Sequence, residues 1–161
     1  MKPVMLATDG SPTAAEATTT AIELARLLDT ELVIVSAWDI PYAALGFGGA
    51  LTTNGELAKL SEEQARRVNA EAAARAEEAD VETRSIVLRG FPVEEICIAV
   101  ETFDPRLLVV GSHGWGPVRR ALFGSVSTGV LHRAACPVLV VRGEHREKDA
   151  TRDDERASIP A

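Results

Sequence analysis

Glycines and serines near the C-terminal end of the chain have the types and spacing needed to bind an anion through backbone N–H groups. Gly111 and Gly114 follow an apolar run, and after nine further residues come Gly124, Ser125 and Ser127. Glycine permits close backbone approach, and the serines open a helical pattern whose dipole favours negative charge. Amides that converge at a helix N-terminus commonly bind phosphate. The pattern therefore predicts a phosphate site.

The segments that position these residues alternate between short β-branched runs and helical patterns, which is typical of βαβ units around a parallel sheet. The sequence predicts strands over residues 3–8, 31–38, 81–88, 106–110 and 137–141. It predicts helices that start at Pro12 and over residues 56–79, 93–102 and 126–135, with 41–55 as a glycine-rich loop. Leu57, Leu60, Val68 and Ala72 are expected on the inward stripe of the second helix.

The fold class that follows is α/β, with a doubly wound parallel sheet of five strands in the order 3-2-1-4-5 and helices on both faces. A hydrophobic fraction of 46% over 161 residues supports a single domain with a real core. That domain is expected over residues 1–142. Residues 143–161 hold six acidic and four basic residues and one large aliphatic residue, so they are expected to form a disordered tail.

Composition also restricts the class of partner. The formal net charge of −7 argues against a nucleic-acid carrier or a protein that binds anionic membranes. No apolar run reaches the length of a membrane span, and Met1 to Met5 lead directly into a strand, so a cytosolic location is expected. Cys97 and Cys136 lie in apolar segments without CxxC spacing and are expected to be buried small hydrophobic residues.

An acidic side chain is expected opposite the glycine loop. In doubly wound sheets a ligand binds at the carboxyl ends of the strands where the winding reverses, and the first strand commonly lies at that point. Asp9 follows the first strand, and Gly111 follows the fourth, so both would border one crevice. A carboxylate that accepts from a sugar hydroxyl, beside amides that hold phosphates, is complementary to a nucleotide.

Each of these residues also has a purely structural interpretation. Gly111 and Gly114 would serve as turn residues after a strand, Ser125 as an N-cap and Asp9 as an Asx cap of the first helix. Taken singly, each structural interpretation is favoured. Taken together, residues placed at strand ends by independent periodicity arguments favour the binding interpretation.

Three segments carry a resemblance to a known family. They are Val4-Met-Leu-Ala-Thr-Asp-Gly-Ser11, the glycine and serine pattern, and Cys136-Pro-Val-Leu-Val-Val141. Residues 1–142 resemble the ATP-binding branch of the universal stress protein family. The resemblance implies a homodimer that pairs through the last strand, Val138 to Val141, and ATP with magnesium held through its phosphates.

The resemblance also implies a role for each matching position. Asp9 would contact the ribose, the backbone near Ala7 and Ala37 would border the adenine, and Val110 and Gly111 would flank the nucleoside. The phosphates would be held by Gly114, Gly124, Ser125, Val126 and Ser127.

Other chemistries fit the sequence less well. No glycine precedes a lysine, so a Walker P-loop is excluded, and Ser112 beside His113 has no identifiable orienting acid. His113, His132 and His145 lack metal-ligand spacing, so neither a catalytic residue nor a protein-bound metal is predicted. Trp38 is expected to be a packing residue.

Three functions remain open. The first is a cytosolic ATP-binding stress or signalling protein in which the nucleotide sets conformation or partner affinity, with slow hydrolysis at most. The second is a nucleotide hydrolase or adenylyl-forming enzyme of similar fold, which would need a general base or a second substrate pocket. The third is a nucleotide-free dimerisation module, which would have no need of the full glycine and serine set.

Overall fold

The computed structural model describes residues 1–39, 51–112 and 124–143, with residues 51–54 described only as part of a helix. Gly114, His113, the predicted loop as far as residue 50 and the tail beyond Gly143 lie outside the described residues. The boundary between a domain over 1–142 and a tail therefore stays a prediction.

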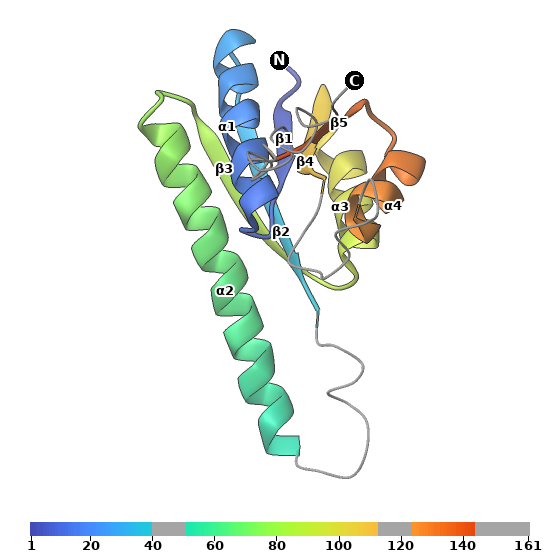
Figure 1. The fold of residues 1–161 in the computed structure, drawn as a ribbon. Coiled ribbons are helices and arrows are strands. Elements are labelled where there is room, and N and C mark those ends of the chain that lie inside the picture. Colours follow the sequence, from blue (N-terminus) through green and yellow to red (C-terminus); the bar gives the residue numbers. More distant parts are fainter. Residues whose placement is uncertain (40–50, 113–123, 144–161) are drawn as a thin grey trace, which may run out of the picture.

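A parallel sheet of five strands lies at the centre of the structure (Figure 1). The strands are β1 (Val4–Ala7), β2 (Leu32–Trp38), β3 (Thr83–Arg89), β4 (Leu107–Gly111) and β5 (Val138–Val141). Their order is β3-β2-β1-β4-β5, as the sequence predicted. In the register, Ala7 lies between Val35 of β2 and Val110 of β4. The three buried central strands carry near-continuous apolar runs because helices cover both of their faces.

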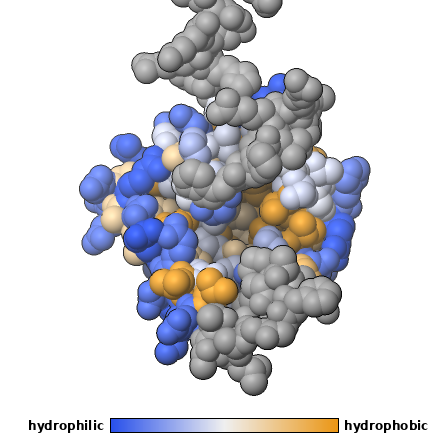
Figure 2. All heavy atoms as spheres, turned by 60° about the horizontal axis from the view of Figure 1, so that its bottom comes forward, coloured by the Kyte–Doolittle hydropathy of each residue, from blue (hydrophilic) through white to orange (hydrophobic). Residues whose placement is uncertain are grey.

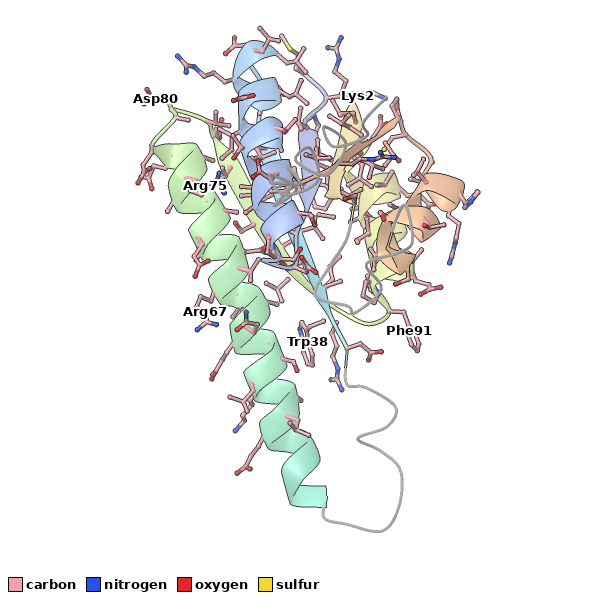
Figure 3. The ribbon with its side chains drawn as sticks, viewed as in Figure 1. Lys2, Trp38, Arg67, Arg75, Asp80 and Phe91 are labelled. Carbon is pink, nitrogen blue, oxygen red and sulfur yellow. The ribbon has the colours of Figure 1, made fainter. Side chains whose placement is uncertain are left out.

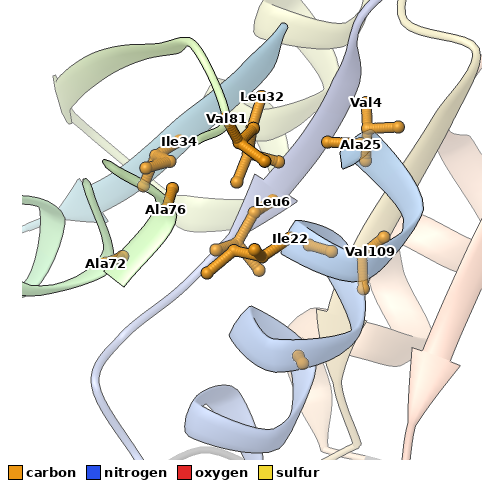
Figure 4. Close-up of a cluster of buried hydrophobic side chains, with 12 residues drawn as sticks. Val4, Leu6, Ile22, Ala25, Leu32, Ile34, Ala72, Ala76, Val81 and Val109 are labelled. Atoms are coloured by element: carbon orange, nitrogen blue, oxygen red, sulfur yellow. The ribbon is translucent and has the colours of Figure 1, made fainter. Parts of the chain in front are cut away.

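Helices cover the two faces of the sheet in pairs. They are α1 (Pro12–Leu27), α2 (Leu51–Glu77), α3 (Pro92–Phe103) and α4 (Ser125–Arg133). Helices α1 and α2 pack on the face that carries Leu6 and Ile34 (Figure 4). Helices α3 and α4 pack on the opposite face, which carries Met5 and Val33. Full burial of one such aliphatic side chain contributes about 1.5–3 kcal/mol, so the two clusters together fix the layers.

Local sequence sets the ends of the helices. Ser11 caps α1, because its Oγ accepts from the N–H of Ala14 at 3.3 Å, and Pro12 supplies a preformed first φ. Asp29 ends α1 in the left-handed region at φ 50°, and Asp80 ends α2 at φ 57°. In both cases the next residue donates its N–H five residues back, to Ala25 and Ala76, which satisfies carbonyls that the helix leaves unpaired.

Helix α2 differs from the prediction in its length and in the burial of its first half. It begins at Leu51 rather than Glu56, so Gly55 is helical and not part of the loop. Leu57 and Leu60 are 43% and 61% exposed, so the predicted inward stripe is wrong for these two residues. Val68 and Ala72 are buried as expected. The reason is that the first half of α2 extends beyond the carboxyl edge of the sheet, where it has no sheet to cover (Figure 1).

In the three described ranges, no helix is both long enough and apolar enough to cross a membrane.

Candidate functional site

The winding of the sheet reverses between β1 and β4. From β1 the chain moves to β2 and β3, and it then crosses back to β4 on the other side of β1. Asp9 lies two residues beyond Ala7, and Gly111 directly follows Val110, which pairs with Ala7. Asp9 and Gly111 therefore lie at the same edge of the sheet, at the ends of neighbouring strands, and that they border one ligand crevice stays a prediction. Figure 2 looks toward this edge of the sheet and shows hydrophobic side chains in its middle, between hydrophilic side chains on either side.

The turn from β1 to α1 presents Asp9 to solvent. Asp9 is exposed, and its Oδ1 accepts from the N–H of Ser11 at 3.0 Å. The Asx geometry weighed as the structural interpretation is thus present. It leaves the carboxylate at the surface, so capping and ligand contact are compatible roles for Asp9.

Gly111 allows the start of α1 to approach the end of β4. A Cβ at this position would lie 2.9 Å from the backbone N of Ala14 and 2.9 Å from the carbonyl carbon of Thr13. Both neighbours are backbone atoms and cannot rotate away. The glycine is therefore required by helix packing, whether or not a ligand also approaches it, and it holds the first turn of α1 beside the crevice.

Ser112 joins β4, β5 and α4. Its N–H donates to Val141 O at 2.7 Å, and its carbonyl accepts from Gly124 N–H at 2.6 Å and from Ser127 Oγ at 3.0 Å. Ser112 is 2% exposed, so these bonds form in a dry environment where polar groups need partners. They fix the N-terminus of α4 at the carboxyl end of β4, as the phosphate prediction requires.

Within the described part of the chain, the first turn of α4 has no side-chain cap. Gly124 is the N-cap and has no side chain, and Ser125 is exposed. Ser127 is 3% exposed, and its hydroxyl faces the carbonyls of Ser112 and Gly124, each at 3.0 Å. The Ser127 hydroxyl therefore links Ser112 to Gly124. The group of Ser127 that could bind an anion is then its backbone N–H.

Apolar residues form the floor of the crevice. Ala7 and Val110 are 8% and 3% exposed and belong to the cluster under α3 and α4, against which Val126 also packs. Ala37 pairs with Leu88 near the end of β2 and is half-buried. Trp38 is buried as a packing residue, with the Arg89 guanidinium 5.5 Å from its ring centre.

Sequence reasoning did not identify a buried polar network beside the crevice. Ser36 Oγ lies 2.7 Å from both Thr8 O and Asn69 Oδ1, and Asn69 Nδ2 donates to Ile86 O at 2.8 Å. The available signal was a serine in an apolar strand and an asparagine beside Val68 on the inward side of α2. Neither position is unusual alone, because only their meeting in space makes them a network.

The two thiols lie away from this chemistry. Cys97 and Cys136 are partly buried rather than fully buried, and burial raises the pKa of each above its ordinary value. Both thiols therefore stay protonated near neutral pH and are poor nucleophiles. Across residues 1–39, 51–112 and 124–143, no group of three histidine, cysteine or acidic side chains is placed to hold a metal ion.

Comparison with known proteins connects this geometry to a family. The model of the universal stress protein family matches residues 1–142. The chain belongs to this family. A universal stress protein of Methanocaldococcus jannaschii is 33% identical over 147 residues, which cover 91% of this chain and 85% of the relative. A universal stress protein of Mycobacterium tuberculosis is also 33% identical, but the chain spans only 45% of its length.

Solved structures of the universal stress protein family share the fold. A family protein from Arabidopsis thaliana with AMP bound has a TM-score of 0.69 at 18% identity, with 94% of this chain and 97% of that one covered. The universal stress protein of Archaeoglobus fulgidus in complex with dAMP has a TM-score of 0.56 at 22% identity, with 88% and 98% covered.

Proposed function

We propose that this universal stress protein binds ATP in the crevice between β1 and β4 and uses the nucleotide to set its conformation or its affinity for a partner. The observation that carries the proposal is the meeting of two different binding elements at the switch point. The exposed carboxylate of Asp9 follows β1, and the uncapped N-terminus of α4 is held at the end of β4 by Ser112. The family membership and the AMP and dAMP in proteins of the same fold support an adenine nucleotide.

In this proposal the described residues contact three parts of the ligand: the ribose, the base and the phosphates. The Asp9 carboxylate would accept from the ribose hydroxyls, and the apolar floor of Ala7, Ala37 and Val110 would border the base. The amides of Ser125, Val126 and Ser127, with the Ser125 hydroxyl, would receive the phosphates together with Gly124. Gly111 and Gly114 complete the predicted set. A magnesium ion would take its ligands from the phosphates and water, with the nucleotide holding it.

Binding rather than turnover is the proposed use of the nucleotide. A hydrolase would need a general base placed on the attacking water, and in the proposed arrangement Asp9, the acidic side chain of the β1–α1 turn, lies at the ribose and not at the phosphates. We also propose a cytosolic homodimer that pairs through β5, whose outer edge has no strand partner among the described residues and whose Leu139 is 37% exposed. Sedimentation that shows only monomer at micromolar concentration would remove the dimer.

The nucleotide proposal is tested with purified protein. Small molecules released by denaturation are identified, and binding of ATP and AMP is measured by calorimetry with and without magnesium. We expect binding by the wild type and loss of at least tenfold in affinity, about 1.4 kcal/mol, in Gly124→Val. Gly124 has φ −72° and ψ 168°, which valine adopts without strain, so the variant should fold.

Gly55→Val is the matched control, because no atom lies within 4 Å of a Cβ at that position and the site is remote from the crevice. It should bind like the wild type. If the wild type neither carries nor binds an adenine nucleotide, the proposed function is wrong. If sustained phosphate release reaches about 1 per second, the protein is an enzyme and not a binding switch.

A further inference from the structure

Helix α2 contacts the turn that carries Asp9, although α2 contributes no residue to the predicted nucleotide site. The helix runs along the face of the sheet that α1 also covers, and at the carboxyl edge it passes β2 and β1 (Figure 1). Figure 3 labels Arg67 and Arg75 along α2, and Arg75 reaches α1, because its Nη2 donates to Thr19 Oγ1 at 2.6 Å. Two neighbouring residues on the inner side of α2, Val68 and Asn69, are 7% and 2% exposed.

Asn69 acts on the turn through Ser36. Two acceptors, Thr8 O and Asn69 Oδ1, each lie 2.7 Å from Ser36 Oγ. They share the single hydrogen of the Ser36 hydroxyl. Asn69 also donates to Ile86 O at 2.8 Å, so one side chain of α2 is linked to the middle of β3, to Ser36 of β2 and, through Ser36, to the residue after β1. The carbonyl of Thr8 belongs to the peptide that leads into Asp9. The network therefore fixes the orientation of the peptide from which the carboxylate is presented.

Val68 acts on the same turn by direct packing. Gly10 has φ +73°, and a Cβ on it would lie 2.8 Å from Val68 Cγ2. The valine therefore lies directly over the Gly10 backbone, which only glycine makes room for. Two contacts therefore stabilise the turn: the hydrogen bond from Ser11 N–H to Asp9 Oδ1 within the turn, and the packing of Val68 of α2 against Gly10.

We propose that α2 is the positioning element of the nucleotide site: Val68 and Asn69 hold the Thr8–Gly10 turn so that Asp9 faces the crevice. This inference rests on the proposed function for its ligand. Because coupling between two sites is reciprocal, a nucleotide that engages Asp9 also tightens the packing of α2 on the sheet.

The first test compares Val68→Ala with Val81→Ala. Both valines are 7% exposed, but Val81 belongs to the core cluster under α1 and α2 and lies at the opposite edge of the sheet, next to the end of α2. Both variants should lose stability. Only Val68→Ala should weaken binding of AMP and of ATP, by about threefold to tenfold, because only its cavity lies over Gly10. Equal affinities in the two variants would overturn the proposal.

The second test removes the hydroxyl that bridges Thr8 and Asn69. Ser36→Ala should weaken AMP binding by about threefold to tenfold, and Ser36→Thr, which keeps an Oγ, should recover at least part of that loss. Thr102→Val is the control, because the Thr102 hydroxyl donates to Ile98 O within α3, which packs on the opposite face of the sheet. The affinity of the control variant for AMP should stay within about twofold of the wild-type affinity.

Hydrogen exchange separates failure of the inference from failure of the proposed function. Without ligand, the Gly10 and Ser11 amides should exchange faster in Val68→Ala than in Val81→Ala, and saturating AMP should slow exchange in wild-type α2 near Val68 to Ala72. If the wild type binds no adenine nucleotide, the proposed function fails and the unliganded exchange still tests the positioning role. Equal exchange at Gly10 and Ser11 in the two variants would overturn that role.

Discussion

Two of the helices that begin at the carboxyl edge of the sheet, α1 and α4, differ in how their N-terminal amides are capped. At α1, Ser11 Oγ accepts from Ala14 N–H and Asp9 Oδ1 accepts from Ser11 N–H, so side chains of the turn itself cap the helix. At α4, the N-cap is Gly124, which has no side chain, and the turn is tied to Ser112 instead.

The difference assigns a role to each side of the crevice. A capped N-terminus has little left to offer an anion, but it can present an exposed side chain such as Asp9. An uncapped N-terminus leaves its first amides for an outside acceptor, and the dipole favours a negative one. The ribose is therefore expected at the α1 side and the phosphates at the α4 side.

The largest expected effect concerns the contact between Gly111 of β4 and the first turn of α1. Gly111→Ala should lower the free energy of unfolding by about 2–3 kcal/mol, because its Cβ meets the α1 backbone and forces α1 away from β4. Gly55→Ala, the same substitution in open space within α2, should instead raise stability by up to about 1 kcal/mol. Chemical denaturation measures both. Equal effects would show that Gly111 does not set the spacing.

The next prediction concerns a substitution that gives α4 a side-chain N-cap like that of α1. Gly124→Asp supplies a side-chain cap, so stability should rise by about 0.5 kcal/mol, and the carboxylate should repel phosphate and weaken ATP binding by tenfold or more. Ser11→Ala should do the reverse, with a loss of about 1 kcal/mol in stability and little change in affinity. Thermal denaturation and calorimetry on the same samples give both quantities. Unchanged ATP affinity in Gly124→Asp would place the phosphates elsewhere.

The smallest effect is at the other end of α4, where Arg133 Nη1 donates to Glu94 Oε1 of α3 at 2.8 Å. The hydrogen bond from Arg133 lowers the pKa of Glu94 in the folded state. A lowered folded pKa gives stability that is present above the unfolded pKa and is lost as the pH falls through the folded value. Both groups are exposed, so Glu94→Gln should change stability only slightly at pH 7.

Denaturation curves between pH 7 and pH 3 check this prediction. The difference between the wild type and Glu94→Gln should shrink as the pH falls below the ordinary glutamate pKa of about 4.3. A difference that grows toward acid pH would contradict the lowered pKa.

Much of the fold follows from hydrophobic periodicity and from capping and turn residues in the sequence. Apolar runs that alternate with helical stripes predicted the parallel sheet, its order and the four helices, and Ser11 with Pro12 marked the start of α1. Prediction was weaker where burial depends on what lies opposite. Leu57 and Leu60 have the spacing of an inward stripe, yet they lie on the part of α2 that no strand reaches.

The same distinction holds for the candidate site. The sequence by itself determined that Asp9 and Gly111 lie at strand ends and that Gly124 and Ser125 open a helix, because these boundaries are set by local pattern. That the two strands are neighbours was predicted from the doubly wound fold and is confirmed by the strand order. Only the tertiary structure decided that Gly111 makes room for α1, that the Ser127 hydroxyl faces inward, and that Asn69 reaches Thr8 through Ser36. These contacts join residues far apart in the chain. Their geometry depends on how whole layers pack, which no local pattern of residues encodes.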